Sequence, residues 1–77
     1  MDYFIKKVIV QKILDDVTIR TRLAAALGLG ERAIWNFCKT YLDKPFPNSN
    51  LTKKAALVYL ESEGFKEDQV LTTETPA

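Results

Sequence analysis

Apolar residues recur with helical spacing through most of this chain, and turn-forming residues divide it into segments. In residues 2–14 the apolar positions lie mostly three or four residues apart, which predicts an amphipathic helix. These positions are Ile5, Val8, Ile9 and Ile13. Because the segment is rich in β-branched residues, a strand over residues 3–10 is the alternative.

Two more helices are predicted in the middle of the chain, over residues 18–27 and 31–42. Asp15, Asp16 and Thr18 supply turn and N-cap chemistry for the first of them. One face of that helix carries Leu23, Ala24 and Leu27. The second helix has an apolar face made of Ile34, Phe37, Cys38 and Tyr41, and an outward face made of Glu31, Arg32, Trp35, Asn36 and Lys39.

Three residues separate these two helices, and so short a connection predicts a tight helix-turn-helix. Gly28 suits the position just past the first helix, where a left-handed backbone is needed and a Cβ would clash. Leu29 is expected to point into the core, and Gly30 to serve as the N-cap of the second helix. The small side chain of Ala24 lets the second helix approach closely.

Beyond Tyr41 the helical pattern ends in a loop over residues 43–50, which contains Pro45 and Pro47. Phe46, between the two prolines, is expected to plug the core. The alternative is that this segment forms an extended, polyproline-like docking strip.

The carboxyl-terminal part predicts a helix over residues 53–63, capped by Asn50 or Thr52, and a short helix over residues 66–71. Residues 72–77 are expected to form a disordered tail. The pattern therefore predicts an all-α fold, a compact bundle of four or five helices containing a helix-turn-helix.

The stretch 20–39 resembles the helix-turn-helix of the phage lambda repressor and Cro family of DNA-binding proteins. That motif asks for a small Ala, a Gly in the turn and a β-branched residue in the second helix, and Ala24, Gly28 and Ile34 stand at those positions. Its four apolar positions are occupied by Leu23, Leu27, Leu29 and Phe37. The chain departs from the motif at its first position, usually Gln and here Arg20, and before the second helix, where Gly30 replaces the usual Ser or Thr.

The resemblance implies a lambda-repressor-like fold and a repressor-like transcriptional regulator that places helix 31–42 in the major groove of double-stranded DNA. It also implies a homodimer on a two-fold operator. Base-reading candidates are Glu31, Arg32, Trp35 and Asn36, whose side chains can pair with cytosine, guanine or adenine, or press on a thymine methyl group. Trp35 could instead fold back onto the core. Phosphate-contacting candidates are Arg20, Thr21, Arg22, Lys39 and Lys44.

The first motif position and the first residue of the second helix carry opposite charges here, as Arg20 and Glu31. In the related family these positions often meet side by side. We therefore predict a salt bridge that orients the Glu31 carboxylate.

Size and composition limit the other possibilities. Seventy-seven residues make one domain, placed at residues 1–71, and the net charge of +1 gives no overall argument for nucleic acid. The charge is uneven, however, since residues 17–44 are basic and residues 45–77 acidic. Cys38 is the single cysteine and is expected to be a buried thiol. With no His, no Cys pair and no phosphate-binding Gly loop, neither an enzyme nor a metal site, cofactor or small-molecule substrate is expected.

No membrane-spanning segment or secretory signal is recognised, which favours a cytoplasmic protein. The alternative function is a small helical protein-interaction module, for example a phage or plasmid accessory protein that keeps the fold without binding DNA. Near-zero net charge, the acidic carboxyl-terminal third and Glu31 at the groove-facing end favour this alternative. The basic stretch 17–44 favours DNA.

Overall fold

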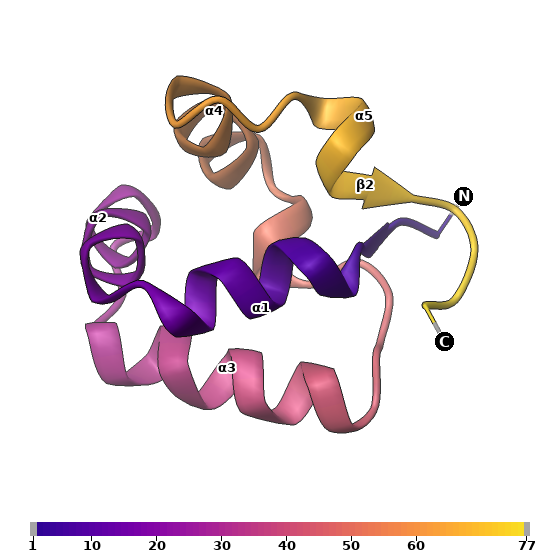
Figure 1. The fold of residues 1–77 in the computed structure, drawn as a ribbon, viewed down its shortest axis with the longest axis horizontal. Helices are drawn as coiled ribbons and strands as arrows, with labels where there is room; N and C mark the ends of the chain where they lie inside the picture. Colours follow the sequence, from indigo (N-terminus) through magenta and orange to yellow (C-terminus); the bar gives the residue numbers. More distant parts are fainter. Residues whose placement is uncertain (1, 77) are drawn as a thin grey trace.

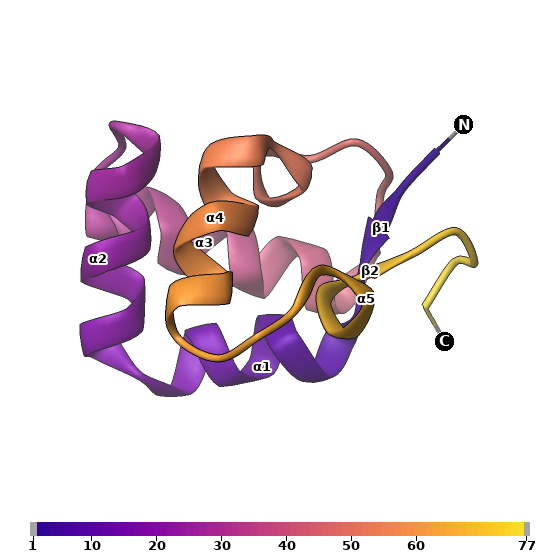
Figure 2. The ribbon, with the colours of Figure 1, turned by 90° about the horizontal axis from the view of Figure 1, so that it is seen from above.

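A computed structural model describes residues 2–76, so Met1 and Ala77, at the ends of the predicted domain and tail, lie outside the described residues. Helix α1 (Lys7–Asp15) crosses the middle of the molecule, with α3 (Glu31–Asp43) on one side and α4 (Lys54–Ser62) on the other (Figure 1). Helix α2 (Val17–Leu27) closes one end (Figure 2). The remaining elements are the 3-10 turn η1 (Asn50–Thr52), α5 (Glu67–Val70) and two short strands, β1 (Phe4–Ile5) and β2 (Leu71–Thr72).

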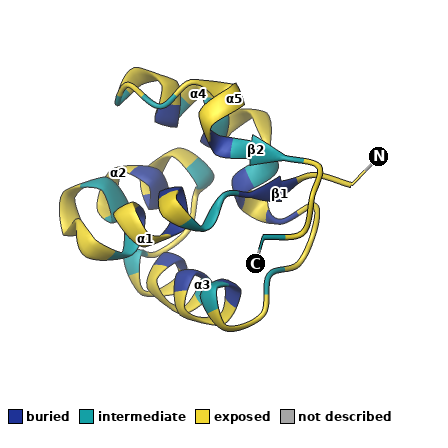
Figure 3. Ribbon diagram, turned by 45° about the vertical axis from the view of Figure 1, so that its right-hand side comes forward, coloured by how far each residue is buried: buried dark blue, intermediate teal, exposed yellow. Residues whose placement is uncertain are grey.

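The all-α fold class is confirmed, and one core joins the first and last elements. Buried faces of the helices point inward and exposed faces outward (Figure 3). The buried cluster extends from Ile5 to Val70 and includes Leu23, Ala24 and Leu60. Segments from both ends of the described chain thus belong to the same hydrophobic core.

The predicted helix over residues 2–14 is wrong at its start, because Phe4 and Ile5 form strand β1. This strand pairs antiparallel with β2, with Ile5 opposite Leu71. The Tyr41 hydroxyl holds the other side of Ile5: it accepts from Ile5 N at 2.8 Å and donates to Ile5 O at 2.7 Å. Val8, predicted to face the core, is 57% exposed, since α1 starts only at Lys7 and turns Ile9 and Val10 inward.

The helix-turn-helix forms by the local chemistry that the sequence indicates. Asp16 caps α2 by accepting from Thr18 N at 2.9 Å and Ile19 N at 3.2 Å, so the side-chain cap is Asp16 rather than Thr18. At the other end Gly28 is left-handed (φ 70°), and Leu29 N donates to Ala24 O at 2.8 Å. These are the marks of a Schellman ending.

One prediction for this turn is wrong: Leu29 does not enter the core and is 39% exposed. Its backbone is fixed by the bond to Ala24, while its side chain stays at the surface. Gly30 precedes α3 as predicted and supplies no side-chain cap.

Helix α3 packs against α1 and α2 through its predicted apolar face. Ile34, Cys38 and Tyr41 are buried there, and Phe37 is partly buried. The prediction of a buried Cys38 thiol is confirmed, and its burial raises the thiol pKa to about 11. The inward face of α3 is therefore committed to the core, and its outward face is free for another role.

The segments after α3 depart from prediction in three places. Phe46 only partly fills the core: its ring packs 5.5 Å from that of Phe37 and remains 36% exposed. Neither Asn50 nor Thr52 caps α4, which begins after Lys53 without a side-chain cap. Thr72, assigned to the disordered tail, lies in β2, because backbone pairing with Phe4 orders it.

Candidate nucleic-acid interface

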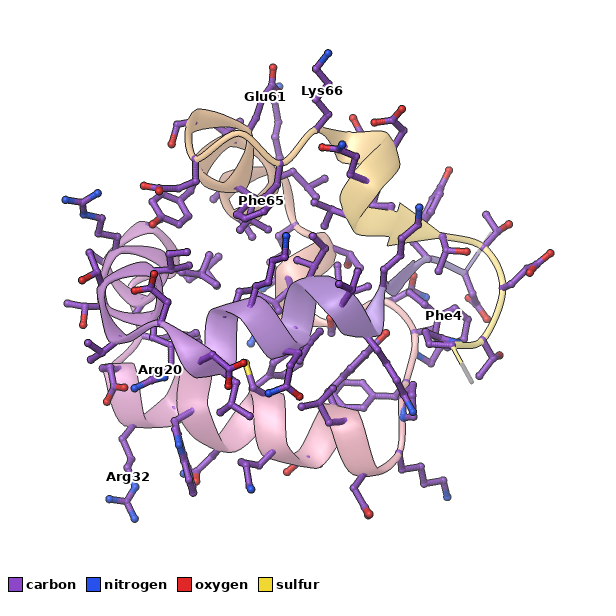
Figure 4. All side chains as sticks on the ribbon, in the orientation of Figure 1. Phe4, Arg20, Arg32, Glu61, Phe65 and Lys66 are labelled. Carbon is purple, nitrogen blue, oxygen red and sulfur yellow. The ribbon has the colours of Figure 1, made fainter. Side chains whose placement is uncertain are left out.

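The predicted ion pair between Arg20 and Glu31 is present and joins α2 to the first residue of α3. Arg20 Nε lies 2.7 Å from Glu31 Oε1, and the Arg20 side chain is only 14% exposed. A second donor of the same guanidinium, Nη1, bonds to the carbonyl oxygen of Leu14 near the end of α1. Arg20, labelled in Figure 4, therefore ties three helices together, and its bond to Glu31 fixes the direction of that carboxylate.

Farther along the exposed face of α3, one aromatic ring lies between two cations. The Arg32 guanidinium and the Lys39 ammonium each lie 5.7 Å from the centre of the Trp35 ring. Trp35 is 36% exposed, so the ring is at the surface rather than folded into the core. Cation–π contacts of this kind hold a ring in place without covering it.

Four side chains enclose a shallow, open hollow on this surface. They are Arg20, Glu31, Arg32 and Trp35. Three of them belong to the first five residues of α3, and the fourth is the arginine that holds Glu31. Asn36, the remaining base-reading candidate, is exposed next to Trp35 along the helix. The structure thus brings the four base-reading candidates together on one end of α3.

The phosphate-contacting candidates are more scattered. Lys39 is close to Trp35, whereas Lys44 follows the far end of α3, about 20 Å along the helix axis from Glu31. The Thr21 hydroxyl is exposed and donates to Val17 O within its own helix at 2.8 Å. Arg20 is engaged in the helix junction described above.

Arg22 is held on the side of α2 that faces α4. Its Nη1 lies 3.3 Å from Glu63 Oε1, and the two side chains are 63% and 26% exposed. Helices α3 and α4 lie on opposite sides of α1 (Figure 1), so this pair draws Arg22 away from the hollow. Of the five predicted phosphate-contacting residues, Lys39 contacts the Trp35 ring and Arg20 lines the hollow beside it.

The ion pairs leave two cations of the outward α3 face without a carboxylate partner in the described residues. Among residues 2–76, the ion pairs are Arg20–Glu31 and Arg22–Glu63, so Arg32 and Lys39 keep their charges unpaired. Arg32 extends outward from α3, and Glu61 extends from α4 at the opposite edge (Figure 4). The outward face of α3 therefore offers two unpaired cations and one oriented carboxylate.

Sequence reasoning missed two contacts of this region. The bond from Arg20 to Leu14 uses a backbone carbonyl, which carries no signature of its own in a sequence. Glu63, the partner of Arg22, lies 41 residues away in the chain, and only the packing of α2 on α4 brings them together.

Within the part of the chain that the structure describes, no helix is both long and apolar enough to cross a membrane. Comparison with known proteins gave no match to a family model, a curated protein or a solved structure.

Proposed function

We propose that this protein is a sequence-specific DNA-binding regulator that places the outward face of α3 in the major groove. The observation that carries the proposal is the arrangement at the start of α3, where Glu31 is oriented by Arg20 while Arg32 and Trp35 remain exposed beside it. A recognition helix needs an exposed polar end on a firmly packed base. Burial of Ile34 and Cys38 supplies that base.

The same residues divide the work of binding. Base contacts are assigned to Glu31, Arg32, Trp35 and Asn36, because all four lie on the accessible end of the helix. Lys39 and Lys44 are assigned to phosphate, since a lysine attracts the backbone without reading a sequence. A two-fold operator requires a homodimer, and its interface is assigned to the exposed surface outside α3.

The test is the anisotropy of a labelled random-sequence duplex titrated with protein at about 50 and about 200 mM salt. Phosphate contacts release counterions, so affinity should fall steeply across this range. The slope of the logarithm of the binding constant against the logarithm of the salt concentration is the salt slope. Lys39→Ala should reduce its magnitude by about 0.9, the value for one phosphate contact. Lys66→Ala, which removes the same charge at the opposite edge, is the matched control and should leave the slope unchanged (Figure 4).

Sequence specificity is tested by selecting duplexes from a random pool. Arg32→Ala should bind the selected duplex about as weakly as a random one, with unchanged size in solution and unchanged thermal unfolding. If the wild-type protein binds no duplex at either salt concentration while remaining folded, the proposal is wrong.

A protein-interaction module is the second candidate. It is favoured by the net charge of +1 and by the exposed Arg32 and Trp35, since Arg and Trp are enriched among residues that dominate protein interfaces. In that case the face of α3 would bind a protein, and its affinity would change little upon addition of DNA.

A further inference from the structure

The first two residues of α3 present opposite hydrogen-bonding groups to the same hollow. Glu31 offers a carboxylate, of which one oxygen is engaged by Arg20. Arg32 offers guanidinium donors, and its charge is not paired with a carboxylate anywhere in residues 2–76. An acceptor and a donor therefore stand side by side at the outward end of the helix.

These two groups are held by different partners. Side chains of consecutive helical residues do not face each other. The carboxylate is held toward α2 at 2.7 Å from Arg20 Nε, and the Arg32 guanidinium lies 5.7 Å from the Trp35 ring. Two cation contacts hold that ring, so Trp35 forms one wall of the hollow.

We infer that this hollow reads one C·G base pair, with Glu31 accepting from the cytosine amino group and Arg32 donating to the guanine of the same pair. This inference rests on the proposed DNA-binding function and adds the identity of a base pair. In the major groove a C·G pair presents one donor, cytosine N4, followed by two acceptors, guanine O6 and N7. The order of charges on Glu31 and Arg32 is complementary to that series.

An A·T base pair fits Glu31 and Arg32 poorly, so the proposed contact discriminates between the two kinds of base pair. In an A·T pair the adenine amino donor lies between two acceptors, adenine N7 and thymine O4. A carboxylate that approaches the amino group would face the lone pairs of those acceptors. Discrimination of C·G over A·T at this position should therefore reach the range of about 5- to 150-fold that one good base contact provides.

The decisive variant is Glu31→Gln, which keeps the size of the side chain and adds a donor. Glutamine pairs well with adenine, whereas Arg32 still donates to guanine, so the preference for C·G over A·T at one position of the selected duplex should narrow while the other positions stay the same. Glu61→Gln removes the same charge from the exposed side of α4 and is the matched control (Figure 4). It should leave every position unchanged.

A second measurement uses the wild-type protein and thus does not depend on the folding of a variant. The cytosine of the required pair is replaced by 2-pyrimidinone, which lacks the amino group, opposite an unchanged guanine. Affinity should fall by about 5- to 150-fold. Equal affinity for the two duplexes, or a selected site with no required C·G pair, would overturn the inference while the DNA-binding function stands. Absence of binding to all duplexes would instead overturn the proposed function.

Discussion

Helix α2 makes one ion pair on each of its two sides, and the two pairs differ in almost every physical respect. On the α3 side, Arg20 is 14% exposed, lies 2.7 Å from Glu31 and also bonds to the Leu14 carbonyl. On the α4 side, Arg22 is 63% exposed and lies 3.3 Å from Glu63. Two arginines two residues apart in sequence thus occupy very different environments.

The difference shows which arginine is structural. A partly buried guanidinium with two partners is costly to remove, because the partners lose their hydrogen bonds and Glu31 loses its counter-charge. An exposed pair contributes little, since water and salt screen it and two long side chains must be ordered. Arg20 should accordingly govern both stability and the orientation of Glu31, whereas Arg22 should govern neither.

The largest effect is expected from Arg20→Met, which keeps much of the side-chain volume and removes the charge. We expect the free energy of unfolding to fall by about 2 to 3 kcal/mol, measured by urea denaturation. A double-mutant cycle with Glu31→Gln should give a coupling energy of about 1 to 2 kcal/mol, several times that of the Arg22 and Glu63 cycle. Equal coupling energies in the two cycles would abolish the distinction between the pairs.

The α3 side can also be examined at alkaline pH, because Cys38 of α3 is buried there. Its thiol has a pKa of about 11, against an ordinary 9.0. Burial disfavours the thiolate in the folded state, so the folded protein holds this proton more tightly than the unfolded chain does. Stability from this group is complete below pH 9 and is lost as the pH rises toward 11, by about 2 kcal/mol.

Cys38→Ala isolates that contribution, because the raised pKa of Tyr41, also caused mainly by burial, is present in both proteins. Urea denaturation at a series of pH values should show a shallower alkaline decline in the variant. Parallel declines would mean that the thiol is accessible to water in the folded state.

The smallest effect is expected from Arg22→Ala on the α4 side. The free energy of unfolding should change by less than about 1 kcal/mol. Because Glu63 holds this arginine on the α4 side, the salt slope of binding to a random duplex should also remain the same. A slope that falls by about 0.9 would instead establish Arg22 as a phosphate contact, as the sequence alone had predicted.

The sequence was informative for much of the structure that depends on local chemistry. The left-handed Gly28 and the apolar face of α3 follow from local spacing, and the Arg20–Glu31 pair was implied by the resemblance of residues 20–39 to a known helix-turn-helix. The candidate base-reading side chains were implied by that same resemblance, and helical periodicity placed them together on the outward face of the helix.

The sequence failed where distant segments override local preference. Phe4 and Ile5 form a strand because β2 and the Tyr41 hydroxyl, both far along the chain, satisfy their backbone groups. The position of Arg22 depended on Glu63 in the same way. Helical periodicity in residues 2–14 contained no information on the contacts with β2 and Tyr41.

The central claim, that the outward face of α3 meets DNA, is tested most directly by the fluorescence of Trp35, the single tryptophan of the chain. Protein is titrated with duplex DNA at about 50 and about 200 mM salt. We predict a change in Trp35 emission that saturates with added DNA at the lower salt concentration and weakens strongly at the higher salt concentration. Unchanged emission at both concentrations, with no mobility shift of the duplex, would contradict the account and direct attention to protein partners.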